Sequence, residues 1–366
     1  MKVLFQTRTT LFLVPGGDTT QVERTADALT RQGCSVDISL ELAPALADYD
    51  VVHLFNLSRP QEIYVQALNA RRAGKKVVLS TIHVNYDEFE LRARTGVSGF
   101  IARSLPNSTR EYLKVCARAA KNGEWHSGVF GLMRSGYRTL QEKTLEMVDL
   151  LLPNSLSEMS RVATDFASAK GLSYRVIPNG VDRILFGSPR GEAPSLTEYK
   201  DCVLCVARIE GLKNQLNLVR AARQLPWSFV LVGKAAPNHA DYYRRVRAES
   251  PSNVVFVDRL AHEQLAPLYR SAKVHALASW METTGLSSLE AGASGCNLVI
   301  TDKGDQREYF GSDAFYCDPQ SVDSIREALI RAYEAPSNHG LRERILSTFT
   351  WDIAASRTLE AYLSLT

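Results

Sequence analysis

The chain has 366 residues, of which 45% are apolar, and this length favours two globular domains over one. Lysine and arginine number 43 against 40 for aspartate and glutamate, a net charge of +3. Because the charge is so balanced and no groove-reading motif is present, we exclude nucleic acid as a partner.

The N-terminal run MKVLFQTRTTLFLV is interrupted by Arg8 and lacks a small-residue cleavage site, so it predicts a core strand and not a signal peptide. No apolar run reaches the length of a membrane span. Strands are expected at residues 3–7, 34–40, 50–55, 76–83 and 148–155. Helical patterns ending at Gly33 and Gly74 separate them, which is the alternation of parallel β-α-β units.

Residues 88–145 interrupt this alternation with a helical and basic segment. Its basic side chains are Arg92, Arg94, Arg103, Arg110, Lys114, Arg118, Lys121, Arg134 and Arg138. Only Glu111 and Glu124 oppose them between residues 91 and 138, and apolar residues such as Phe100, Ile101, Trp125 and Phe130 are interleaved. One interpretation is a surface for anionic lipid or an anionic acceptor. The other is an ordinary insertion whose apolar side packs inward.

A second alternation begins after RVIPNGVD at residues 175–182. Strands are expected at residues 202–209, 228–234, 254–260, 274–279, 296–301 and 314–318. The economical interpretation is two doubly wound α/β domains in tandem. The last segment, FTWDIAASRTLEAYLSL, predicts an amphipathic helix with Trp351, Ala354, Leu359 and Tyr362 on one side.

The six cysteines are scattered, and several lie in apolar runs where a thiol packs as a small hydrophobe. Cys202 and Cys205 form a C-x-x-C pair, but the pair lies in a strand-like run and no second pair accompanies it. We therefore expect buried thiols in a reducing cytoplasm, and neither a zinc site nor a redox pair.

Two stretches at strand ends could meet an anion. Gly16 and Gly17 follow the first apolar run and precede a helix, where the backbone can approach a ligand closely, although such a pair can equally be only a turn. In ARIEGLKN, Arg208 and Lys213 stand at the mouth of a strand. The planar guanidinium of Arg208 and the mobile ammonium group of Lys213 suit a diphosphate. The alternative is that both are solvated surface charges.

The third stretch is WMETTGLSSLEAGASG, which begins at Trp280. The amides of Thr283, Thr284, Gly285 and Leu286 should open a helix and could bind a phosphate or sugar hydroxyls. Glu290 follows Glu282 by eight positions, about 80° round an ideal helix, so both carboxylates could point toward one cleft. Alternatively, Glu282 only complements the helix dipole and Glu290 is solvated.

This pattern of two glutamates before AGASG and an apolar strand resembles the signature of the retaining glycosyltransferases of family four (glycosyl transferases group 1), which have the B-type fold of two Rossmann-like domains. The resemblance covers nearly the whole chain, because PGGDTTQVERTADALTRQGCSV, VIPNGVD, ARIEGLKN and the closing helix are similar to further family segments in the same order. It implies domains at residues 1–170 and 171–348 that face each other across a cleft. It also implies a C-terminal helix, residues 349–366, that returns toward the first domain.

The resemblance also implies roles for particular residues. Arg208 and Lys213 would hold the diphosphate of a nucleotide sugar, Glu282 the donor sugar and Glu290 the ribose hydroxyls. Gly16 and Gly17 would let the first loop close over the phosphates, and His83 would lie near the donor sugar, although a lone histidine can also be a satisfied buried group. Gly233 would line the base or phosphate side, where relatives often carry a second glycine in place of Lys234-Ala235.

The implied activity is metal-independent, retaining transfer from a nucleotide-diphosphate sugar to a glycan or lipid-linked acceptor, without a bound cofactor, in cell-surface polysaccharide biosynthesis. Fixed cations would stabilise the charge that develops on the departing phosphate. The expected location is the cytoplasm or the inner face of an anionic membrane. The alternatives are an epimerase or phosphorylase of the same fold, or a non-catalytic binder of nucleotide sugars.

Overall fold

The computed structural model describes residues 1–92, 105–188 and 199–365, and their contacts divide them into two compact units. Residues 1–91, 105–179 and 351–365 form the N-terminal unit. Residues 180–188 and 199–350, together with Arg92, form the C-terminal unit. Among the described residues, no helix combines the length and the apolarity needed to cross a membrane.

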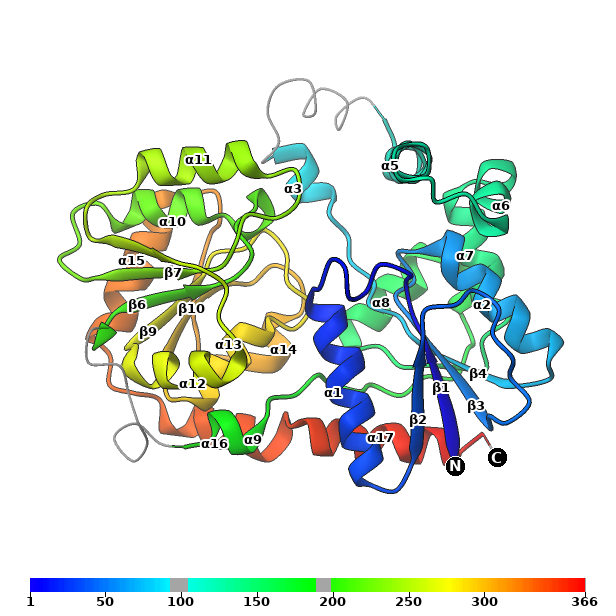
Figure 1. The fold of residues 1–366 in the computed structure, drawn as a ribbon. Coiled ribbons are helices and arrows are strands. Elements are labelled where there is room, and N and C mark those ends of the chain that lie inside the picture. Colours follow the sequence, from blue (N-terminus) through cyan, green and yellow to red (C-terminus); the bar gives the residue numbers. More distant parts are fainter. Residues whose placement is uncertain (93–104, 189–198, 366) are drawn as a thin grey trace. The chain divides into compact units, whose positions relative to one another are not determined.

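The N-terminal unit is built on a parallel sheet with the strand order β2-β1-β3-β4-β5 (Figure 1). Its strands are β1 (Lys2–Gln6), β2 (Ser35–Ser39), β3 (Val51–Phe55), β4 (Lys76–Ser80) and β5 (Leu150–Leu151). All five coincide with the predicted runs. Every residue of β3 is buried, as expected for a central parallel strand covered on both faces.

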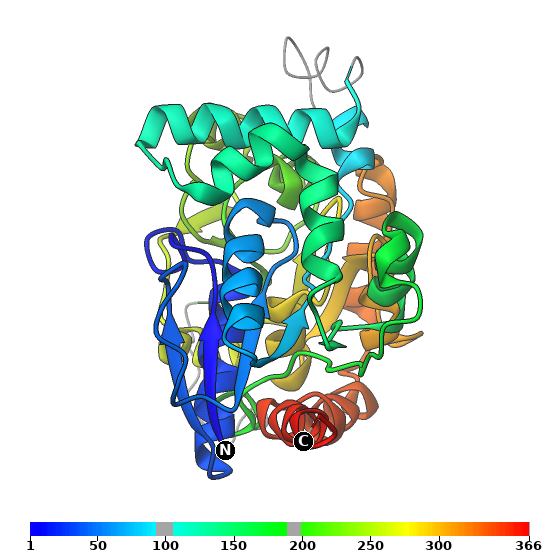
Figure 2. The same cartoon turned by 90° about the vertical axis from the view of Figure 1, so that its right-hand side faces the viewer.

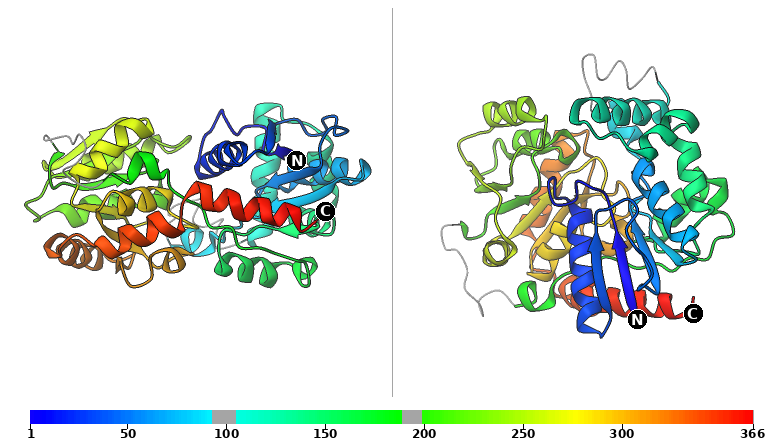
Figure 3. Two further views of the ribbon diagram at one scale, coloured as in Figure 1. Left: turned by 90° about the horizontal axis from the view of Figure 1, so that it is seen from below. Right: turned by 45° about the vertical axis from the view of Figure 1, so that its right-hand side comes forward.

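Helices surround this sheet. They are α1 (Gly17–Arg31), α2 (Pro60–Arg72), α3 (Asp87–Arg92), α5 (Asn107–Asn122), α6 (Ser127–Ser135), α7 (Tyr137–Leu145), α8 (Leu156–Asp165), the 3₁₀ turn η1 (Ala167–Ala169) and α17 (Trp351–Leu363). The last of these packs along α1 (Figure 3). Asp352 accepts hydrogen bonds from Arg31 and Gln32, and the Tyr362 hydroxyl lies 2.6 Å from Nδ1 of His53. The buried stripe runs through Ala355 and Thr358, so Leu359 is only half-buried at its edge.

The described part of the basic segment forms the end of α3 and the helices α5, α6 and α7. The last three lie together at one end of the unit (Figure 2). Val115, Leu132, Tyr137 and Leu140 form a small core between these helices. Leu113, Trp125, Phe130 and Met133 are exposed. Inward packing therefore accounts for one set of apolar side chains but not for the other. Arg94, Phe100, Ile101 and Arg103 lie outside the described residues.

The chain leaves the N-terminal unit later than the predicted boundary at residue 170. Residues 171–179 stay with this unit because they continue along β5. The amide of Leu151 donates to the Ser173 carbonyl, the amide of Arg175 to the Leu151 carbonyl, and the amide of Ile177 to the Pro153 carbonyl. The change of unit therefore falls after Asn179, and the chain returns at Trp351.

The C-terminal unit has a parallel sheet with the order β11-β10-β9-β6-β7-β8. Its strands are β6 (Val203–Val206), β7 (Phe229–Val232), β8 (Val254–Val257), β9 (Val274–Leu277), β10 (Asn297–Thr301) and β11 (Phe315–Cys317). All six were predicted. The helices are α9 (Arg183–Phe186), η3 (Gly211–Lys213), α10 (Gln215–Ala222), α11 (Ala240–Glu249), α12 (His262–Ser271), α13 (Leu286–Ala293), α14 (Gln306–Phe310), α15 (Val322–Glu334) and α16 (His339–Thr348).

The strand order alone predicts where each sheet would bind a ligand. In the C-terminal sheet the order reverses between β6 and β9, and in the N-terminal sheet between β1 and β3. Loops that leave such neighbouring strands in opposite directions open a crevice at the carboxyl edge, where open α/β sheets bind ligands. The two loops of the C-terminal switch point are ARIEGLKN and SWMETTG, the stretches that carry Arg208, Lys213 and Glu282.

All six cysteines are free. Five of them are buried, and Cys116 is half-buried. Burial raises the pKa of the Cys205 thiol to about 12. Cys202 and Cys205 therefore belong to the β6 packing.

Candidate functional site

The two loops at the switch point of the C-terminal sheet are locked together by the backbone. The amide of Trp280 donates to the Leu212 carbonyl at 2.9 Å. Asn214, with φ at +57°, donates from its side chain to the carbonyls of Ala278, at 3.0 Å, and Pro319, at 2.8 Å. The turn after β6 is thus fixed on the turn after β9, and the charged side chains of both turns are brought together.

Lys213 and Glu282 form the central ion pair of this site. Nζ of Lys213 lies 2.5 Å from Oε1 of Glu282, and the two side chains are 18% and 9% exposed. The main chain of Glu282 is held as well, because its amide donates to the Lys303 carbonyl and its carbonyl accepts from the Asp305 amide. Because the Glu282 main chain is fixed on both sides, its carboxylate holds Lys213 in place at the carboxyl end of β6. An anionic ligand would compete with Glu282 for Lys213.

Arg208 is the more accessible cation, with a side chain 46% exposed. Its guanidinium donates to Oε1 of Glu210 at 3.1 Å, and its carbonyl accepts from the Gln215 side chain at 2.9 Å. Glu210 is buried, and sequence reasoning missed it as a partner. The backbone of Arg208 is fixed, and its guanidinium reaches solvent. The guanidinium is therefore accessible to a diphosphate that binds from solvent.

The segment from Thr283 to Leu286 is a turn followed by the start of α13. Gly285 has φ at +71° and caps the helix, which begins at Leu286. Thr284 is buried and its hydroxyl lies 3.2 Å from the Tyr309 hydroxyl, whereas Thr283 is half-buried. The turn is therefore rigid, and its amides stand at a helix N-terminus as expected.

The helical-wheel argument for Glu282 and Glu290 was wrong. Because Gly285 takes up the left-handed conformation, no helix connects the two glutamates, and Glu282 lies in a short bridge to Gly304. The carboxylates instead have separate partners. Glu290 accepts from the Tyr269 hydroxyl at 3.2 Å and lies 3.4 Å from Nε2 of His262. Burial and the Glu290 charge raise the pKa of the Tyr269 phenol well above its ordinary value, so it remains a donor.

Gly233 lies at the end of β7, where only glycine fits. Its φ is +149°, and a Cβ would stand 2.0 Å from the Ala207 carbonyl oxygen. The close approach allows two backbone bonds between the β6 and β7 loops, from Ala207 to Val232 and from Ile209 to Lys234. Gly233 therefore supports the loop that carries Arg208.

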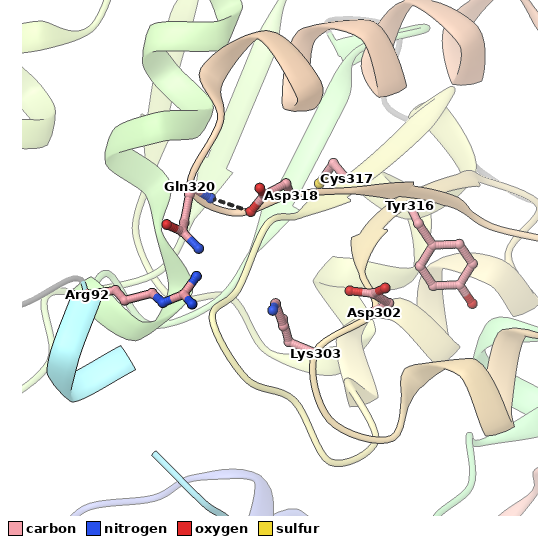
Figure 4. Close-up of a pocket in the computed structure, with 7 residues that line it drawn as sticks. All are labelled: Arg92, Asp302, Lys303, Tyr316, Cys317, Asp318 and Gln320. Atoms are coloured by element: carbon pink, nitrogen blue, oxygen red, sulfur yellow. Dashed lines mark hydrogen bonds between the residues drawn. The ribbon is translucent and has the colours of Figure 1, made fainter. Parts of the chain in front are cut away.

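A pocket of about 430 Å³ lies at the carboxyl ends of β10 and β11 (Figure 4). It is lined by Arg92, Asp302, Lys303, Tyr316, Cys317, Asp318 and Gln320. It adjoins the bridge of Glu282, since the Lys303 carbonyl accepts the Glu282 amide. Sequence reasoning named Arg92 only as part of the basic segment and proposed no ligand site at the ends of β10 and β11, because these two strands carry no recognisable motif.

In the N-terminal unit, the loop after β1 ends at Gly16 and Gly17. Gly16 caps α1, with its amide donating to the Thr19 hydroxyl, and Gly17 is the first helical residue. The buried Arg8 holds the loop from inside, with bonds to both Asp18 oxygens and to the carbonyls of Thr10 and Val14. Burial opposes ionisation of Asp18, but the Arg8 hydrogen bonds and charge outweigh it and hold the pKa of this carboxyl below its ordinary value.

His83 lies just beyond the end of β4 and is 7% exposed. Its Nε2 lies 2.6 Å from Oδ2 of Asp165, and the hydrogen bond from His83 lowers the pKa of the Asp165 carboxyl. The His83 amide donates at 2.8 Å to Glu158, a fully buried carboxylate that also accepts from the Thr81 hydroxyl and the Asn154 amide. The histidine is thus oriented by two acids that sequence reasoning did not name.

Two parallel α/β units, each with charged loops at its switch point, define the class of proteins with paired Rossmann-like units. Comparison narrows this class, because residues 192–346 match the family model Glycosyl transferases group 1. This part of the chain is therefore similar to that family, the one whose signature the sequence resembles.

Two curated relatives and one solved structure extend the comparison. The chain is 27% identical over 242 residues to MMP alpha-(1->4)-mannosyltransferase of Mycolicibacterium hassiacum, covering 62% of this chain and 57% of the relative. It is 26% identical over 255 residues to D-inositol 3-phosphate glycosyltransferase of Kribbella flavida, covering 62% and 59%. The chain thus spans less than two thirds of the length of either relative.

Anabaena HepE, solved in complex with UDP-glucose, matches over 100% of both chains with a TM-score of 0.69 at 15% identity. A likeness at this identity concerns the fold alone. The protein therefore has the two-unit B-type glycosyltransferase fold that the sequence predicted.

Proposed function

We propose that the protein is a glycosyltransferase that moves a sugar from a nucleotide-diphosphate donor to a glycan or lipid-linked acceptor, in cell-surface polysaccharide biosynthesis. The observation that carries the proposal is the Lys213–Glu282 pair, held at the switch point of the C-terminal sheet beside the accessible Arg208. The family of residues 192–346 and the names of the curated relatives support the same activity.

Each part of the donor would have its own partner in this proposal. Arg208 and Lys213 bind the diphosphate, and the amides at the start of α13 donate to it. Glu282 accepts from hydroxyls of the donor sugar, and Glu290 accepts from the ribose. The nucleobase remains open, and the UDP-glucose of HepE makes uridine one of the candidates.

Transfer would be driven electrostatically. Cleavage at the anomeric carbon places negative charge on the β-phosphate, and Arg208 and Lys213 stabilise this charge more in the transition state than in the ground state. We propose that these fixed cations do the work that a metal ion does in other transferases. We also propose that the product retains the anomeric configuration, with the acceptor attacking on the face from which the phosphate departs.

A thermal-shift panel of GDP-, UDP-, ADP- and CDP-sugars without metal tests donor binding. The wild type is compared with a variant carrying Arg208→Ala and Lys213→Ala. Stabilisation by one nucleotide class that disappears in the double variant supports the proposal and identifies the donor class. Stabilisation without turnover of any acceptor favours the non-catalytic binder, and conversion of the donor sugar without an acceptor favours the epimerase.

A second observation concerns location. Residues 105–145 contain seven basic and three acidic side chains, a net charge of +4 that exceeds the +3 of the whole chain. On these helices and in the connection between α5 and α6, Leu113, Trp125, Phe130 and Met133 are exposed, and the Trp125 and Phe130 rings stack at 5.9 Å. Exposed aromatic side chains among cations suit the interface of an anionic membrane. We propose peripheral binding at the cytoplasmic face.

Co-sedimentation with vesicles tests this location. At low salt, vesicles containing phosphatidylglycerol should bind the protein, and phosphatidylcholine vesicles should not. Trp125→Ser with Phe130→Ser should release it. Tyr174→Ser, which removes an aromatic side chain that is 45% exposed elsewhere, is the matched control. Equal binding to both kinds of vesicle, or none to either, contradicts the membrane proposal.

A further inference from the structure

The N-terminal unit contains a pocket of about 300 Å³ that lies entirely within it. This volume is at the small end of the range for sites that bind small molecules. The lining comes from the loop after β4, the start of α5, α7 and the end of α8. Its residues are Ser58, His83, Val84, Asn85, Tyr86, Asp87, Pro106, Asn107, Ser108, Glu111, Tyr137, Arg138, Gln141, Asp165 and Phe166.

The walls of this pocket combine aromatic faces with neutral hydrogen-bonding groups. Tyr86 is 37% exposed, whereas Tyr137 and Phe166 are buried and form a fixed apolar wall. Tyr137 is held by a 2.8 Å bond from its hydroxyl to the Ser58 carbonyl. Two asparagines, a glutamine and two serines add neutral donors and acceptors. Such a lining suits a compact ligand with many hydroxyl groups.

The charges of the pocket are unfavourable to an anion. Three carboxylates line it, against Arg138 and His83 as the basic groups in the described lining. Each carboxylate has a basic partner: Asp87 accepts from Arg110 at 2.6 Å, Glu111 from Lys114 at 2.7 Å, and Asp165 lies 2.6 Å from the His83 ring. Arg138 itself donates to the backbone carbonyl of Asp165. A phosphate placed here would have to displace one of these pairs, and it would meet the remaining carboxylates at close range.

His83 supplies a single directed acceptor. Asp165 is acceptor-only when ionised, so its 2.6 Å contact places the imidazole proton on Nε2. In the neutral imidazole Nδ1 then carries the lone pair, and this atom is buried without a hydrogen-bond partner in the described residues. A buried acceptor with no donor is costly, and a hydroxyl of a bound ligand would satisfy it.

We infer that this pocket binds the acceptor, and that the acceptor is an uncharged sugar rather than a phosphorylated polyol. The inference rests on the proposed function and adds its substrate class. Asp165 is then a positioning residue for His83, and Asp87 and Glu111 are the residues that exclude a phosphorylated acceptor. The distinction matters because one of the two relatives is named for an inositol phosphate, which is a phosphorylated polyol.

The test compares methyl α-D-mannoside and methyl α-D-glucoside with their 6-phosphates, by saturation-transfer difference NMR on the full chain. The neutral glycosides should bind, and each phosphate should bind at least tenfold more weakly. Equal or tighter binding of the phosphates overturns the inference, and so does the absence of binding by any of the four sugars. Because no nucleotide is present, failure here is separate from failure of the donor panel.

Two charge variants connect the result to the residues. Asp87→Asn with Glu111→Gln removes both carboxylates and releases Arg110 and Lys114, so the phosphorylated sugars should gain at least fivefold in affinity while the neutral ones change little. Glu124→Gln removes one carboxylate outside the pocket lining, and it should leave both affinities unchanged. If Glu124→Gln raises phosphate binding as much as the double variant, the selectivity comes from overall charge and the assignment to this pocket is wrong.

Discussion

Nζ of Lys213 lies 2.5 Å from Oε1 of Glu282, although 69 positions separate the two residues. The pair is mostly buried, so removing one partner leaves an uncompensated charge. Its formation depends on the strand order, which brings the loops after β6 and β9 to one point. This relationship yields the first prediction.

Lys213→Met should lower transfer activity by about 100-fold or more, the range for losing one preorganised stabiliser of developing charge. It should also destabilise the fold by about 3 kcal/mol, because Glu282 is left unpaired. Adding Glu282→Gln should restore much of the stability but none of the activity. Urea unfolding and kcat/KM separate the two effects, and full activity in Lys213→Met would remove the lysine from the mechanism.

Two glycines predicted at the donor site should respond differently to alanine. In Gly233→Ala the new Cβ meets the Ala207 carbonyl at 2.0 Å and the backbone is at φ +149°, so the loss of stability should be at least about 1–3 kcal/mol. In Gly16→Ala the nearest atom is an Asp18 oxygen at 3.0 Å and φ is −148°, so the change should stay below about 1 kcal/mol. Urea unfolding of both variants checks the contrast, and equal losses would contradict the geometry at Gly233.

The strands were predictable because a buried parallel strand is an apolar run between turn residues, and all eleven runs became strands. The positions of Arg208 and Lys213 at a strand mouth were also readable from the sequence. Side-chain partners were not. Asp165 reaches His83 only because α8 docks beside the end of β4, and no spacing in the sequence encodes that docking.

The error at Glu282 has a local cause. The Thr-Thr-Gly turn was visible, but the wheel argument continued the helix through Gly285, whose left-handed backbone begins the helix instead. The change of unit after Asn179, and not at residue 170, also has a local cause. The backbone bonds that keep residues 171–179 beside β5 leave no apolar periodicity to detect.

Asp165→Asn should show how the His83 pair depends on pH. The pKa of Asp165 is lower in the folded protein than its ordinary value of 3.8, through the hydrogen bond from His83. The stabilisation is therefore complete above pH 3.8 and is lost as pH falls through the folded pKa. Wild type should be more stable than Asp165→Asn at pH 6, and the difference should shrink toward pH 2. A difference that grows on acidification would contradict this sign.

The loop after β1 gives the last prediction. Arg8 binds Asp18 at 2.6 and 3.1 Å and also the carbonyls of Thr10 and Val14, while Phe12 and Leu13 at the loop tip are exposed. Removing the guanidinium leaves Asp18 buried without its main partner and frees the loop backbone. Arg8→Met should therefore speed hydrogen exchange of residues 9–16.

The same variant separates loop order from chemistry. If the loop contributes to donor binding, Arg8→Met should raise KM for the nucleotide sugar several-fold while kcat changes little, because the loop makes the same contacts in the ground and transition states. Arg31→Met is the matched control. It breaks an arginine–aspartate pair whose side chains are 59% and 63% exposed, and an ion pair this exposed contributes little to stability. Faster exchange with an unchanged KM would keep Arg8 as the organiser of the loop and would remove Gly16 and Gly17 from the donor site.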